Sequence, residues 1–233
     1  MLKMSGKESD QIQESGTLLS TPVADMAGGI IFVDSDTGTL SGVKISDVMS
    51  NMDGLSRRDR VRYDTPAFAG FTISGSLTEE SKQDVGIVYS GKTDTNQFAV
   101  AAGYAHQDTG STEHQYNGSA SLIIDNKFNI SLAGGMRQLD SATREEPYFA
   151  YGKLGYKANI TSFGSTNFAI DYGYFKHISQ DDDDAQTVGL FAVQNVDSVG
   201  VDIYAGYRWH ELDRTGTDFD DINAFLFGSR VKF

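Results

Sequence analysis

The sequence contains no cysteine, only 3 prolines, and fewer basic than acidic side chains, 19 against 32. The absence of cysteine excludes a disulfide scaffold, a thiolate metal site and a thiol nucleophile. The formal net charge of −13 argues against nonspecific nucleic-acid binding, which needs clustered Lys and Arg. No apolar run approaches the roughly 20 residues of a membrane-spanning helix. That absence leaves membrane-spanning strands open, because their alternating side chains average out in hydropathy.

What the chain does contain is strand-like alternation of polar and apolar residues from Arg57 onward. Phe128, Ile130 and Leu132, for example, oppose Asn129 and Ser131. The pattern predicts an all-β, antiparallel fold, and only the segment 186–194 is ambiguous. The eleven predicted strands are 57–64, 70–78, 83–90, 96–106, 115–124, 128–139, 147–158, 167–178, 186–194, 199–212 and 221–233.

The connections between these strands are of two kinds, which alternate along the chain. One kind is mostly tight and poor in acidic residues, as at 91–95 and 125–127. The other is mostly longer and acidic, as at 107–114, 140–146 and 212–220. Short turns at one rim and long loops at the other are typical of outer-membrane barrels, whereas a sandwich has no reason to sort its loops.

The polar face of the predicted strands carries many charges. So many charges cannot be buried without partners, so we expect most of them to face water inside a wide barrel. The residues expected on this lumen-facing side are Arg58, Arg60, Arg62, Asp64, Lys153, Lys157, Asp171, His177, Asp202, Arg208, Arg230 and Lys232.

The last segment, 223–233, reads NAFLFGSRVKF and places Phe225, Phe227, Val231 and Phe233 on one face. A soluble domain rarely ends on an exposed apolar edge, because such an edge pairs with other chains. In a membrane barrel the same face meets lipid. The ending resembles the C-terminal strand that outer-membrane proteins present to the barrel-assembly machinery, with Phe233 as the assembly signal.

Residues 55–71, LSRRDRVRYDTPAFAGF, resemble the strand that follows the constriction loop in the general porins of Gram-negative outer membranes. The resemblance implies a sixteen-stranded trimeric barrel in the outer membrane, in contact with lipid and lipopolysaccharide. It implies passive diffusion of ions and small hydrophilic solutes, with no reaction and no cofactor. Residues 1–22 would then be an irregular segment, 23–56 the remains of the constriction loop, and 57–233 the barrel strands.

The sequence departs from the family pattern at its beginning. It shows neither a secretory signal nor the five strands that would precede the constriction loop. An up-and-down sheet of eleven strands cannot close antiparallel, because its first and last strands run in the same direction. We therefore expect an N-terminally truncated porin that forms a partial barrel.

Arg58, Arg60 and Arg62 share one face of a single predicted strand. In porins, a basic ladder on the wall faces acids of the constriction loop, and the field between them sets ion preference. The resemblance thus implies a pore constriction between these arginines and acids of the loop segment. The acids are Asp34, Asp36 and Asp47.

Two other functions remain open from the sequence: a secreted or surface β-rich binding protein, and an outer-membrane barrel hydrolase. The second needs a Ser, a His and an acid to converge, and no motif supports it. His106, His114, His177 and His210 lack metal-ligand spacing. The run Asp181–Asp184 suits a divalent cation in composition, but its spacing matches no ordered calcium loop and favours a solvated outer loop.

Overall fold

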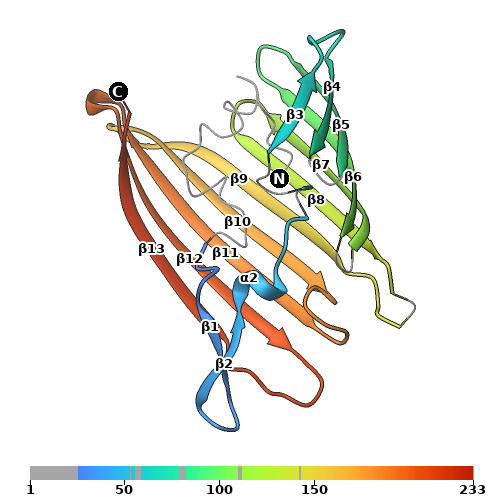
Figure 1. Ribbon diagram of the computed structural model, residues 1–233. Helices are drawn as coiled ribbons and strands as arrows, with labels where there is room; N and C mark the ends of the chain where they lie inside the picture. Colours follow the sequence, from blue (N-terminus) through green and yellow to red (C-terminus); the bar gives the residue numbers. More distant parts are fainter. Residues whose placement is uncertain are drawn as a thin grey trace.

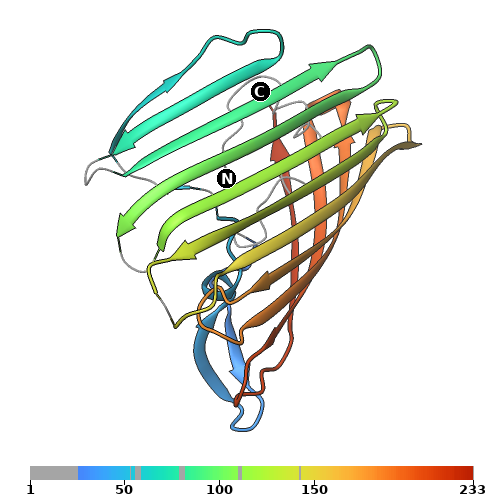
Figure 2. The ribbon, with the colours of Figure 1, turned by 90° about the vertical axis from the view of Figure 1, so that its right-hand side faces the viewer.

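The computed structural model describes residues 26–52, 54–55, 59–78, 82–109, 112–141 and 143–232. Its main element is one antiparallel sheet of eleven strands, in which each strand pairs with its neighbour in sequence (Figures 1 and 2). The predicted all-β antiparallel fold is confirmed. The predicted irregular segment 1–22 lies outside the described residues.

The eleven strands follow the predicted ranges closely, and the ambiguous segment 186–194 is a regular strand. The strands are β3 (Arg60–Asp64), β4 (Phe71–Thr78), β5 (Gln83–Lys92), β6 (Gln97–Thr109), β7 (Thr112–Ile124), β8 (Phe128–Leu139), β9 (Tyr148–Thr161), β10 (Gly164–Lys176), β11 (Asp184–Val196), β12 (Val201–Asp213) and β13 (Ile222–Val231).

Two connections are shorter than predicted. The prediction of a long loop at 107–114 is wrong, because β6 runs to Thr109 and β7 starts at Thr112. His106 pairs with His114 in this extension, and Tyr104 pairs with Tyr116 next to it. The rings of His106 and His114 lie 5.2 Å apart, so ring packing continues the ladder beyond the expected end. The turn expected at 159–166 also shrinks, because β9 extends to Thr161 and β10 begins at Gly164.

Within the described part of the chain the sheet is curved but not closed. β3 and β13 form its two edges. Nine strands of alternating direction lie between them in the pairing order, so both edges run the same way. The short turns gather at the rim where the C-terminus lies, and the longer loops gather at the other (Figure 1).

The outward face of the sheet is apolar and uncovered. Phe128, Leu132 and Ile203 are 50%, 58% and 53% exposed. Large apolar side chains on a sheet face are normally buried against a second layer. No second layer covers this face in the described residues, which excludes a sandwich and fits a surface that faces hydrocarbon.

The direction in which the side chains of β8 point can be tested directly. Leu132 points outward near the middle of the strand, and its neighbour Ser131 points inward, where its hydroxyl lies 3.0 Å from that of Ser121. We expect Leu132→Lys to destabilise the folded protein in lipid by about 2–4 kcal/mol, because it places an ammonium group in hydrocarbon. Urea unfolding in lipid bilayers measures the difference. The matched control Ser131→Lys should cost much less, and equal costs would contradict the assigned facing.

A small second element lies inside the curve of the sheet. The hairpin β1 (Ile31–Asp34) and β2 (Thr39–Lys44) leads into the short helix α2 (Ile45–Val48), and both lie on the concave side (Figures 1 and 2). We call residues 26–55 the inner segment. Among the described residues no helix has the length and apolar character needed to cross a membrane.

The inner segment packs against the long-loop half of the inward face. Phe32, Ile45, Val48 and Met49 are fully buried there. The sheet contributes inward side chains from β9 to β12 to this cluster: Phe149, Phe175, Ala185 and Leu212. The inward face is therefore apolar where the inner segment covers it and polar elsewhere.

Candidate functional site

The candidate site is the inward face of the sheet, together with the inner segment that covers part of it. Strand alternation places polar side chains on this face, and the strand register decides which of them meet. Three groups of charges line it: one on β10 and β12, one near the short-turn rim, and one on β3 to β5.

The first group is a buried ion pair between Asp171 and Arg208. Arg208 donates to the Asp171 carboxylate at 2.7 Å. The Arg208 side chain is only 1% exposed and the Asp171 side chain 3%. Tyr151 donates its hydroxyl to the same carboxylate at 2.8 Å. The guanidinium also lies 5.1 Å from the centre of the Phe191 ring. Both charges were predicted on the lumen-facing side as solvated groups, but the structure buries them against each other.

Gly189 makes this ion pair possible. Asp171 and Arg208 lie on β10 and β12, and each pairs in register with Gly189 on the intervening strand β11. A Cβ atom at Gly189 would collide with the Asp171 carboxylate and with the Phe191 ring. The missing side chain therefore lets a contact form across three strands.

The second group lies toward the short-turn rim. Arg230 and Lys232 each approach a carboxylate oxygen of Asp202 at 2.8 Å, and Asp202 is only 1% exposed. Asn195 donates its amide to Asp202 at 2.8 Å. One carboxylate thus forms ion pairs with two cations.

The third group lies on the edge of the sheet. Arg60 pairs with Asp84 at 3.3 Å, and Arg62 pairs with Asp64 on its own strand at 2.7 Å. Ser76 donates to the other oxygen of Asp84 at 2.6 Å. Arg58 lies outside the described residues. Asp84 was not among the predicted site residues, although its position in an alternating strand places it on the polar face.

The acids predicted for the constriction all lie on the inner segment. The Asp34 carboxylate accepts from the backbone N–H of Thr37 at 2.9 Å, in the exposed turn that also contains Asp36. The Asp47 carboxylate accepts from the backbone N–H of Lys44 at 2.9 Å and so stabilises the start of α2. The pairing of the arginines with Asp34, Asp36 or Asp47 stays a prediction.

Polar side chains of the wall hold the end of the inner segment. Gln115 and Asn117 donate their amides to the Met52 carbonyl at 2.8 and 2.7 Å. Arg137 donates to the Ser50 hydroxyl at 2.9 Å. The sequence analysis did not single out these three wall residues as functional, because the contacts join positions far apart in the chain.

The acidic run Asp181–Asp184 is tied to the protein's own cations. Asp183 forms a two-bond contact with Arg214 at 2.6 and 2.9 Å. Asp181 lies 3.7 Å from Arg144, and Asp184 lies 3.7 Å from Lys176. The part of the chain that the structure describes contains no group of three or more His, Asp or Glu side chains arranged to hold a metal ion.

The four histidines lie at three separate places in the fold, and only His106 and His114 are neighbours. His177 contacts Glu145 at 2.6 Å in the outer loops, and His106 lies 3.4 Å from His114 at the end of the β6–β7 hairpin. His210 is fully buried, with its Nδ1 3.4 Å from the sulfur of Met49 on the inner segment.

Comparison with known proteins agrees with the architecture. No curated protein matches the chain. The family model described as Gram-negative porin matches residues 14–215. This match covers most of the chain and all but the last strand of the sheet. The chain therefore belongs to the Gram-negative porins, β-barrel proteins of the outer membrane.

Proposed function

We propose that the protein lets ions and small hydrophilic solutes diffuse passively through a water-filled barrel in the outer membrane. The observation that carries this proposal is the two-faced, single-layer sheet. Its outward side chains are large, apolar and uncovered, and its inward face carries charges and amides. Membership of the porin family points to a channel rather than to an enzyme.

Conductance in a planar lipid bilayer tests this function. We expect stepwise, ohmic current increments when the purified protein is added at low concentration. A secreted binding protein predicts solubility without detergent and no current. A barrel hydrolase predicts ester cleavage, which no described cluster of Ser, His and acid supports. A folded, bilayer-inserted protein that carries no current would overturn the proposal.

A charged constriction is the finer part of the proposal. The inner segment occupies the concave side of the sheet and so narrows the lumen. Arg58, Arg60 and Arg62 would supply the basic side of a transverse field, and Asp34, Asp36 and Asp47 the acidic side. The two described arginines have carboxylate neighbours, and Asp34 and Asp47 accept backbone hydrogen bonds. These contacts do not remove the charges of the arginines or of the acids. A transverse field between the two groups is therefore compatible with the described contacts.

Neutralising the wall arginines tests the constriction. We expect Arg60→Gln with Arg62→Gln to change the anion-to-cation permeability ratio by up to about fivefold, the effect of roughly 1 kcal/mol at partly exposed charges. The reversal potential in a salt gradient gives this ratio. Lys92→Gln, an exposed charge on β5 at the short-turn rim and outside the inner segment, is the control. An unchanged reversal potential in the double variant would reject a role for these arginines.

Several partners follow from the same reasoning and are also proposed. The outward apolar face fits outer-membrane lipid, and the acidic loops fit divalent bridging to lipopolysaccharide. The apolar face of β13 and Phe233, which lies outside the described residues, fit recognition by the barrel-assembly machinery. A homotrimer of the complete barrel is proposed from the family alone.

A further inference from the structure

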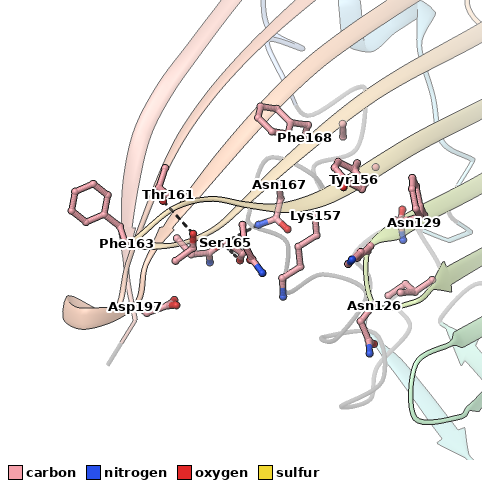
Figure 3. A pocket seen from close by; sticks show the side chains of 18 of the residues that line it. Asn126, Asn129, Tyr156, Lys157, Thr161, Phe163, Ser165, Asn167, Phe168 and Asp197 are labelled. Carbon is pink, nitrogen blue, oxygen red and sulfur yellow. Dashed lines mark hydrogen bonds between the residues drawn. The ribbon is translucent and has the colours of Figure 1, made fainter.

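A wide hollow lies on the inward face near the short-turn rim. Its volume is about 1260 Å³. Turn 125–127 and the adjoining parts of β8, β9 and β10 form most of its wall. Arg230 of β13 and Lys232, just beyond that strand, add two basic side chains. Figure 3 shows Lys157 among Asn126, Asn129 and Asn167, with Asp197 at a distance from it. The hollow adjoins the first residue of the inner segment, because Ala169, which lines it, packs in one cluster with Met26. The apolar cluster around α2 packs against the other half of the face.

The lining is cationic. It contains Lys127, Lys153, Lys157, Arg230 and Lys232, and Asp197 is the one carboxylate among the lining residues that the structure describes. The carboxylates just behind the wall already form ion pairs with basic side chains. Asp202 lies between Arg230 and Lys232, and Asp171 holds Arg208. Among the described residues that line the hollow, basic side chains therefore outnumber acidic ones.

Lys157 and Lys127 concentrate this excess. The backbone N–H of Lys157 donates to the Lys127 carbonyl at 2.8 Å, which fixes the two residues side by side. Neither forms an ion pair with any other residue that the structure describes. Two neighbouring ammonium groups without a carboxylate repel each other, and a bound anion would relieve that repulsion.

Neutral hydrogen-bond donors complete the wall. Asn126, Asn129 and Asn167 line the same hollow, and Asn167 lies opposite Lys157 in the strand register. Asn167 already donates its amide to Asn195 at 2.9 Å, which fixes the orientation of its side chain. Ammonium groups and amide N–H groups that converge on one space suit ligands rich in anionic oxygen.

We propose that this hollow binds small oxyanions, with inorganic phosphate as the model ligand. The role of such binding in transport rests on the proposed channel function: anions inside the barrel would concentrate at this wall before they leave the short-turn rim. Binding itself does not depend on current, so the two proposals can fail separately.

The test is a calorimetric titration of the detergent-folded protein with inorganic phosphate at low ionic strength. We expect saturable binding that Lys157→Gln weakens about fivefold, as expected for one partly exposed charge contact, and that Lys157→Glu weakens further. Lys157→Arg keeps the charge and should retain binding. Lys92→Gln is the matched control, because Lys92 is an exposed lysine at the same rim but lies on β5, outside the hollow.

Heat-modifiable migration on a gel confirms that each variant is folded. Saturable binding that only the Lys157 variants weaken supports the site. Absence of saturable binding, or equal weakening by Lys92→Gln, overturns it, since diffuse charge would then explain the result. Channels that conduct without binding phosphate would reject the anion site alone. Phosphate binding to a bilayer-inserted protein without current would reject the channel function alone.

Discussion

Asp171→Asn will destabilise the folded protein by about 3–5 kcal/mol, because it leaves the Arg208 guanidinium buried without its countercharge. Arg208 is fully buried and Asp171 is 4% exposed, so water cannot replace the lost partner. Urea unfolding in detergent micelles measures the effect. The single tryptophan of the chain, Trp209, adjoins Arg208 and provides the fluorescence signal.

Asp64→Asn is the matched control for this variant. Its partner Arg62 lies at the same distance of 2.7 Å, but the two side chains are 43% and 32% exposed. An exposed pair contributes about 0–1 kcal/mol, so the control should unfold nearly like the original protein. Replacing both buried partners, as Asp171→Leu with Arg208→Met, should recover most of the loss. Equal stabilities of Asp171→Asn and Asp64→Asn would show that the pair on β10 and β12 is solvated in the folded protein.

Val48→Asp will detach the inner segment and increase single-channel conductance. Val48 is completely buried, with 0% of its surface exposed. It packs in a cluster with Phe32, Phe149 and Phe175. Burying an unpartnered polar group there costs roughly 2–7 kcal/mol, and an ionised carboxylate costs more. Detachment of the inner segment from the wall costs less free energy than burying the introduced carboxylate would, and it widens the lumen.

Ser46→Asp provides the control, because Ser46 is an exposed residue of the same helix. It adds the same charge without disturbing the cluster, so conductance should stay close to that of the original protein. Limited proteolysis of the inner segment gives an independent measurement and should be faster in Val48→Asp only. Unchanged conductance together with faster proteolysis would mean that the segment does not narrow the lumen.

Most of the fold could be predicted from the sequence because each strand of a membrane barrel carries its own period-2 signal. Strand β8 matches the predicted range 128–139 at both ends. The segment 186–194 was ambiguous because its inward face carries Phe191 and Val193. These two residues pack with Ala169 and Met26 of the inner segment, so both faces of β11 are apolar there.

The site was predictable in part. Alternation indicated which side chains face inward, including Asp171, Asp202 and Arg208, but it could not indicate their partners. The Asp171–Arg208 contact depends on the register of three strands and on Gly189, and no local pattern encodes that register. The same limit explains why Asp84 and the wall residues that hold Met52 were not singled out.

The distribution of charge along the barrel has an electrical consequence. Acidic side chains such as Glu145, Asp181 and Asp220 gather at the long-loop rim, while Lys127 and Lys157 line the opposite end. A pore with mouths of opposite sign rectifies: current is larger when the voltage drives cations in through the acidic mouth and anions in through the basic one, since both then accumulate. The asymmetry fades at high salt, and at low salt its polarity would reveal which way each channel entered the bilayer.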